Sequence, residues 1–185
     1  ILHKEYHEKN FSKKGGEMQM VQLWVNLPAK DKMTEPKYQN IENKDLAKVD
    51  LGNGIGSIDI IAGEFENSKG PASSFTPLSL FNVKLNKGKG TSLSFNENDN
   101  TGLLIIKGNV IINNKERAPT NHFVLFENKG KEFTIKAEDE AEILVLSGEP
   151  IDEPIASYGP FVMNTNDEIR QTIDDFNSGK FGYLD

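Results

Sequence analysis

The sequence predicts an all-β protein, folded as a double-sheet β-barrel of the jelly-roll type with one C-terminal helix. Short runs rich in β-branched and aromatic residues follow one another along the 185-residue chain. Turns rich in Asn, Gly and Lys separate these runs at roughly the 8–12-residue spacing of antiparallel sandwiches and barrels. Only one stretch, close to the C-terminus, repeats its apolar residues with the period of a helix.

The first segment of the chain has the pattern of two strands. His3, Glu5 and His7 occupy every second position, so in a strand their side chains would project to one face. A turn rich in lysine and glycine follows at residues 13–16. Residues 18–27 then alternate imperfectly between apolar and polar side chains and end before a proline, which predicts a second strand that covers a core.

A polar stretch from Ala29 to Lys44 contains Pro36 and Asn40 and is predicted to link two domains. Residues 45–49 after it are expected to form a short strand or a turn. Further strands are expected at residues 55–63, 78–85, 91–95, 102–107, 109–112, 122–127, 132–136 and 141–147.

The alternation within these strands predicts which side chains form the core. Burial is expected to be greatest at Leu23, Val25, Ile58, Ile60, Phe81, Leu104, Ile106, Leu125, Ile143 and Val145. Because side chains alternate across a strand, an error of one residue in register would move a whole set to the opposite face.

The predicted helix runs from about Thr165 to Ser178. Thr165 and Glu168 have the spacing of a capping box, and apolar residues recur after it at 169, 173 and 176. A glycine at position 179 is a typical stop signal. The apolar run at 160–163 just before the helix is expected to pack as a clasp rather than to bind a ligand.

Composition excludes several classes of protein. A net charge of −7 and a pI near 5.1 argue against direct, charge-driven nucleic-acid binding. The absence of cysteine suits a reducing compartment, so we expect a cytoplasmic protein. No apolar run approaches the roughly 20 residues that cross a bilayer. The chain starts at Ile1 without a signal-peptide pattern, and we expect it to begin inside a longer gene product.

The run His3-Lys4-Glu5-Tyr6-His7 is the strongest candidate for chemistry. Two histidines with one carboxylate form a ligand set that suits iron, manganese, copper, nickel or zinc. The alternative is that these polar residues lie exposed on a frayed terminus and bind nothing, because the spacing H-x-E-x-H alone is a weak signal.

Two further blocks of sequence carry a resemblance to a known family. The first is Gln22-Leu23-Trp24-Val25-Asn26-Leu27-Pro28, followed by Pro36 and Tyr38-Gln39. The second comprises Gly148-Glu149-Pro150-Ile151, Glu153-Pro154-Ile155 and Gly159-Pro160-Phe161-Val162-Met163-Asn164-Thr165. Together with the H-x-E pair at His3 and Glu5, these blocks resemble the pirin family over essentially the whole chain.

The resemblance implies the later part of a bicupin. Residues 1–39 would be the C-terminal strands of a first, metal-binding cupin barrel, and residues 40–185 a second cupin barrel with the helix and tail. In pirins an H-x-H pair on an early strand and an H-x-E pair hold the metal, commonly iron. His3 and Glu5 match the H-x-E pair, whereas the H-x-H pair has no counterpart in this sequence.

The resemblance also implies a function. Several pirins are quercetin 2,3-dioxygenases, so the complete protein would oxidise a flavonol-like aromatic enediol at iron(II), with Glu5 as the general base. The alternative is a regulatory cupin that binds metal and a protein partner without catalysis. The 185-residue chain alone is expected to bind metal weakly, to lack activity and to self-associate.

The remaining candidates receive structural interpretations. His7 shares the predicted strand face with His3 and Glu5 and is treated as a supporting or substitute ligand. His122 is interpreted as a histidine at the start of a strand with a hydrogen-bonded ring. The second barrel is expected to hold no metal, because residues 88–98 contain no H-x-H pair.

Overall fold

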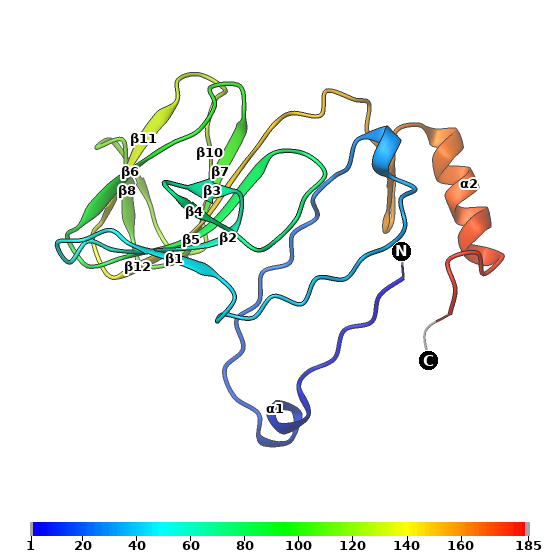
Figure 1. The fold of residues 1–185 in the computed structure, drawn as a ribbon, viewed down its shortest axis with the longest axis horizontal. Coiled ribbons are helices and arrows are strands. Elements are labelled where there is room, and N and C mark those ends of the chain that lie inside the picture. The colour runs from blue at the N-terminus through cyan, green and yellow to red at the C-terminus, as the bar shows by residue number, and fades with distance from the viewer. Residues whose placement is uncertain (1, 184–185) are drawn as a thin grey trace. The chain divides into compact units, whose positions relative to one another are not determined.

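A computed structural model describes residues 2–183, which fold mainly as short antiparallel strands (Figure 1). The chain divides into two compact units. Tyr38–Pro150 forms one unit, and Ile151–Asp185 groups with Ile1–Lys37 in the other. The boundary near residue 38 lies within the polar linker that the sequence predicts, while the assignment of residues 1–39 and 40–185 to two cupin barrels stays a prediction.

Two antiparallel sheets make up the unit Tyr38–Pro150. The larger has the order β1 (Ala47–Asp50), β2 (Gly56–Ala62), β5 (Leu78–Leu85), β12 (Ala141–Gly148), β7 (Asn100–Lys107) and β10 (Phe123–Leu125). The smaller has the order β6 (Gly90–Ser94), β11 (Glu132–Ala137), β8 (Val110–Ile112) and β9 (Glu116–Ala118). A short hairpin of β3 (Glu64–Phe65) and β4 (Ser68–Lys69) lies between β2 and β5.

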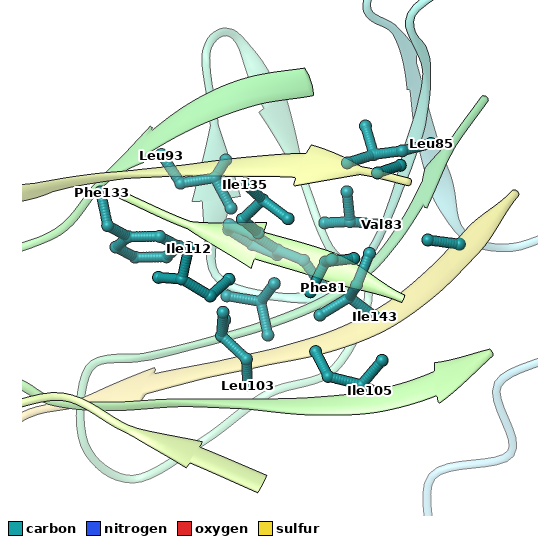
Figure 2. Close-up of a cluster of buried hydrophobic side chains, with 14 of the residues drawn as sticks. Phe81, Val83, Leu85, Leu93, Leu103, Ile105, Ile112, Phe133, Ile135 and Ile143 are labelled. Carbon is teal, nitrogen blue, oxygen red and sulfur yellow. The ribbon is translucent and has the colours of Figure 1, made fainter. Parts of the chain in front are cut away.

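The two sheets enclose one hydrophobic core, to which alternate residues of each strand contribute (Figure 2). In β5, Phe81, Val83 and Leu85 are buried in this core, while the intervening side chains lie on the other face. The smaller sheet contributes Leu93, Val110, Ile112, Phe133 and Ile135. Because both sheets bury one face against the other, the unit has the double-sheet barrel architecture that the sequence predicts.

The expected core positions are confirmed on three strands and wrong on two others. Ile58, Ile60, Phe81, Ile143 and Val145 are fully or almost fully buried. In β7, however, Leu103 and Ile105 are buried in place of the expected Leu104 and Ile106. Leu125 in β10 is 72% exposed.

The error in β7 has a physical cause. Residues 103–106 are four consecutive apolar side chains, so alternation in the sequence fits either register. Pairing with β12 decides between them: Val145 lies opposite Leu103, and Ile143 lies opposite Ile105. A β-bulge, where the pairing shifts between Glu142 and Ile143, separates this register from the end of the strand.

The described residues of the other unit form two α-helices, a 3-10 turn and a β-hairpin. These are α1 (Lys9–Lys14), η1 (Ala29–Asp31), the hairpin of β13 (Ala156–Tyr158) with β14 (Phe161–Met163), and α2 (Asn166–Asn177). Figure 1 shows the blue N-terminal segment running as an extended chain on both sides of α1. Neither the strand expected around His3, Glu5 and His7 nor the strand expected at residues 18–27 forms.

The predicted burial of Leu23 and Val25 is also wrong, since these side chains are 38% and 57% exposed. A strand is stable only when a neighbouring strand receives its backbone hydrogen bonds. Among the described residues, no strand pairs with any residue between 2 and 28. The segment therefore has the composition of a strand without the partner that would make it one.

The predicted C-terminal helix is confirmed as α2. Thr165 accepts a hydrogen bond from the Glu168 backbone N–H at 3.2 Å, and the Glu168 carboxylate accepts one from the Thr165 N–H at 2.7 Å. These reciprocal bonds form the expected capping box. The apolar run before it forms β14, where the Phe161 ring packs edge-on against Phe176 of α2 at 5.9 Å between centroids. The run at 160–163 thus packs as the predicted clasp.

Candidate functional site

The candidate metal ligands lie in an irregular part of the N-terminal segment. His3, Glu5 and His7 are all exposed, and none belongs to a helix or strand. The Glu5 Oε1 atom accepts a hydrogen bond from Gln22 Nε2 at 3.3 Å, which links the segment before α1 to the segment after it. The His7 ring packs edge-on against the Phe11 ring, with 5.8 Å between centroids.

Glu8, the next carboxylate along the chain, has a structural role. Its side chain caps α1 by accepting a hydrogen bond from the Phe11 backbone N–H at 2.8 Å. Bonds from the backbone N–H groups of Asn10 and Phe11 lower the pKa of Glu8, because they favour the ionised carboxylate. Glu8 is therefore engaged at the helix and differs in role from Glu5.

The donor types at His3 and Glu5 fit a divalent metal ion, but their number does not complete a site. Imidazole nitrogen and carboxylate oxygen are ordinary ligands of iron, manganese and zinc. Between residues 2 and 183, however, no group of three or more His, Cys, Asp or Glu side chains comes close enough together to hold a metal ion. His3 and Glu5 therefore supply at most part of a coordination sphere in this arrangement.

His122 belongs to the other unit, immediately before β10. Its Nδ1 atom lies 3.2 Å from the Thr120 carbonyl oxygen, at hydrogen-bond distance. The predicted role, a histidine at a strand start with a hydrogen-bonded ring, is confirmed.

The interior of the barrel is filled by side chains. Five phenylalanine rings follow one another through it: Phe65, Phe81, Phe95, Phe133 and Phe126, with successive centroids 6.0, 5.8, 6.1 and 4.4 Å apart. The cavity bordered by Phe95, Phe126 and Phe133 has a volume of only about 70 Å³. Pockets for drug-sized molecules occupy roughly 300–1,000 Å³. This cavity is therefore too small for a flavonol.

A larger hollow of about 440 Å³ lies at the turn between β1 and β2. It is open to the surface and is lined by residues 48–50, Gly52–Gly54, Gly56, Ser57 and Asn86, with Asp50 as its single carboxylate. This lining offers neither an aromatic wall nor a set of convergent ligands, so it does not form a site for the predicted chemistry.

Three residues that tie the first segment in place are not predicted as site residues from the sequence. Gln22 bonds to Glu5, as described above. Glu153 and Asn164 form a hydrogen-bonded pair at 2.9 Å, and Glu153 also receives the backbone N–H of Ala29. The only sequence signal for them is their place in the resemblance blocks.

In the described part of the chain, no helix is long and apolar enough to cross a membrane.

The two-sheet barrel with a closed aromatic interior defines a cupin-type protein. Within that class the match is specific: residues 80–182 fit the family described as the pirin C-terminal cupin domain. The chain belongs to the pirin family.

Relatives and solved structures agree with this assignment. A Pseudomonas aeruginosa protein, provisionally named a quercetin 2,3-dioxygenase, is 39% identical over 181 residues, which are 98% of this chain and 63% of that protein. Human pirin is 32% identical over 167 residues, or 88% of this chain and 57% of its own length. The crystal structure of a quercetin 2,3-dioxygenase from Acinetobacter baumannii matches with a TM-score of 0.84 and 42% identity, covering 88% of this chain and 56% of that one. The chain thus spans less than two thirds of the length of these relatives.

Proposed function

We propose that this chain is the later part of a metal-dependent dioxygenase that acts on a flavonol-like aromatic enediol. The observation that carries the proposal is the H-x-E pair at His3 and Glu5, in a chain 39–42% identical to proteins named as quercetin 2,3-dioxygenases. The filled interior of the barrel supports a structural role for residues 40–185, with the catalytic site in a first barrel.

The proposal assigns residues 1–39 to the last strands of that first barrel. Support comes from residues 18–27, where Met20, Trp24 and Val25 are more than half exposed although their composition is that of a buried strand. Partner strands from the rest of a longer protein would bury these side chains and receive the unpaired backbone groups.

Within the first barrel, His3 and Glu5 would hold a divalent ion, with iron(II) as the form that the family resemblance favours. When bound, such an ion supplies Lewis-acid and redox chemistry beside the substrate. His3 would contribute an imidazole nitrogen. Glu5 contributes a carboxylate oxygen and accepts the proton of the substrate hydroxyl as general base, while Gln22 holds its Oε1 atom by a hydrogen bond.

A regulatory cupin without catalytic activity is the second candidate. It is favoured by relatives such as human pirin and the tomato pirin-like protein, which are 32% and 33% identical and whose names state no reaction. In that case the metal would have a structural or sensing role, and a protein partner would replace the aromatic substrate.

Oxygen uptake by the complete gene product tests the proposal, with quercetin as the substrate and metal content measured in parallel. His3→Ala and Glu5→Gln should each lower the metal content. They should also reduce quercetin-dependent uptake by about 100-fold or more, since both a ligand and the general base are affected. His122→Ala is the matched control and should leave both quantities unchanged. Full activity in His3→Ala would contradict the proposal, and metal binding without any oxygen uptake would support the regulatory alternative.

A further inference from the structure

The tripeptide Glu-Pro-Ile occurs twice, at 149–151 and 153–155, and the two glutamates behave differently. Glu149 is exposed, and its carboxylate forms no hydrogen bond or ion pair with any residue between 2 and 183. Glu153 is partly buried, and its Oε2 atom accepts two hydrogen bonds. One comes from the Ala29 backbone N–H at 2.7 Å, and the other comes from Asn164 Nδ2 at 2.9 Å.

Asn164 connects this carboxylate to α2. Its Nδ2 group also donates to the Pro154 carbonyl oxygen at 3.0 Å, and its backbone N–H donates to the Glu168 carboxylate of the capping box, also at 3.0 Å. Its Oδ1 atom is buried without a hydrogen bond among the described residues. A buried, unpaired acceptor costs free energy. The amide nevertheless keeps the orientation that serves Glu153 and Pro154, so these two bonds determine how it is placed.

The turn that carries Ala29 is held by hydrogen bonds of its own. Ala29 is the first residue of η1, where a backbone N–H lacks a partner within its own turn. Lys32 Nζ donates to Asn26 Oδ1 at 2.6 Å and to the Leu27 carbonyl oxygen at 2.8 Å. These bonds join the two ends of residues 26–32, and Glu153 contacts this turn through Ala29.

We propose that Glu153 is a positioning residue that fastens the C-terminal tail to the turn at residues 26–32 and thereby orders the preceding segment, residues 18–25. That segment carries Gln22, the donor to Glu5. Ala29 directly follows the Gln22–Pro28 run of the first resemblance block, and Glu153 lies in the second, 124 residues further on, so the hydrogen bond between them forms one clamp. The clamp itself stands on the contacts above, while its effect on Glu5 as a metal ligand rests on the proposed function.

Trp24, the single tryptophan of the chain, lies inside the ordered segment and reports on it directly. In the 185-residue chain, diluted until it is monomeric, Glu153→Ala should lower the fluorescence anisotropy of Trp24. It should also accelerate amide exchange at Ala29 by about tenfold or more, because the N–H loses its acceptor. Glu149→Ala, in the other copy of the tripeptide, is the matched control and should change neither. Glu153→Gln should keep both quantities close to their values in the parent chain, since the amide oxygen can still accept both bonds. Equal values in Glu153→Ala, Glu149→Ala and the parent chain would overturn the proposal.

Ala29→Pro gives an independent variant if Glu153→Ala fails to fold. Proline is tolerated at the first position of a helical turn, and Pro28 already has φ −57° and ψ 151°, which suit a residue before proline. This change removes only the donor N–H, so it should lower the Trp24 anisotropy as Glu153→Ala does, and the double variant should show no additional loss. Unchanged anisotropy in Ala29→Pro would contradict the clamp.

Metal affinity in the complete gene product separates the clamp from the proposed function. Competition with a chelator should show weakening by about tenfold in Glu153→Ala, a loss typical of residues that support metal ligands, and no change in Glu149→Ala. If the complete protein binds no metal through His3 and Glu5, the proposed function fails. The Trp24 anisotropy still shows whether the clamp exists. If the anisotropy and the exchange rate are unaffected, the clamp fails whatever the metal affinity is.

Discussion

Asp175 is buried on α2 although it carries a charge, because two neighbours donate to its oxygens. Lys180 Nζ and Gln171 Nε2 each lie 2.9 Å from the carboxylate. The hydrogen bond from Lys180, followed by that from Gln171, lowers the pKa of Asp175 below its usual value. A carboxyl group whose pKa is lowered by folding stabilises the folded state above its unfolded pKa, and this contribution is lost as the pH falls through the folded pKa.

Asp175→Asn should therefore loosen the C-terminal end of α2 at neutral pH. Amide exchange at residues 178–180 should be several-fold faster than in the parent chain at pH 7. The difference should shrink at acidic pH, as the pH falls through the lowered pKa of Asp175 and the aspartate of the parent chain loses its charge. Asp174→Asn is the control, because Asp174 is exposed and should give the parent rates throughout. A difference that persists unchanged at pH 2 would show that shape rather than charge is responsible.

At the scale of elements, local signals predict much of the fold. Strands β2, β5, β6, β11 and β12 lie within about two residues of their expected bounds, since turn residues and β-branched runs are local features. The register of β7 could not be predicted, because four consecutive apolar residues fit both faces and pairing with β12 decides. The short pairs β3–β4 and β13–β14 lack the length that makes alternation visible.

At residues 18–27 the local signals are misleading. Their composition predicts a strand, but no strand of the described chain pairs with them. Their unpaired backbone and exposed Met20, Trp24 and Val25 resemble an unprotected sheet edge. We expect the 185-residue chain to self-associate through this segment. Val25→Lys should shift it toward monomer in sedimentation velocity experiments, because a charge on an edge opposes pairing.

A control on a different strand makes this test specific. Leu125 in β10 is 72% exposed and lies at the edge of the six-stranded sheet. Leu125→Lys should leave the association unchanged. If Leu125→Lys dissociates the oligomer and Val25→Lys does not, the interface lies on β10 instead.

At the scale of the whole molecule, sequence reasoning identified the candidate ligands but not what holds them. His3 and Glu5 are visible because ligand types recur at a fixed spacing. Gln22 and Glu153 act on partners 17 and 124 residues away, and such hydrogen bonds leave no periodic pattern in the sequence. The number of metal ligands also could not be predicted, because it depends on which other strands surround His3 and Glu5 in space.

The metal affinity of the 185-residue chain follows from this incomplete shell. When only His3 and Glu5 bind, water must occupy most of the coordination positions of a six-coordinate ion. Ordering the exposed segment around them costs about 1–2 kcal/mol per residue in backbone entropy. We therefore expect elemental analysis of the purified chain to find far less than one metal ion per molecule, and oxygen electrodes to detect no quercetin-dependent uptake. Stoichiometric iron that resists chelation would contradict this expectation. His7→Ala would then show whether His7 supplies the additional ligand, since its loss would release the iron.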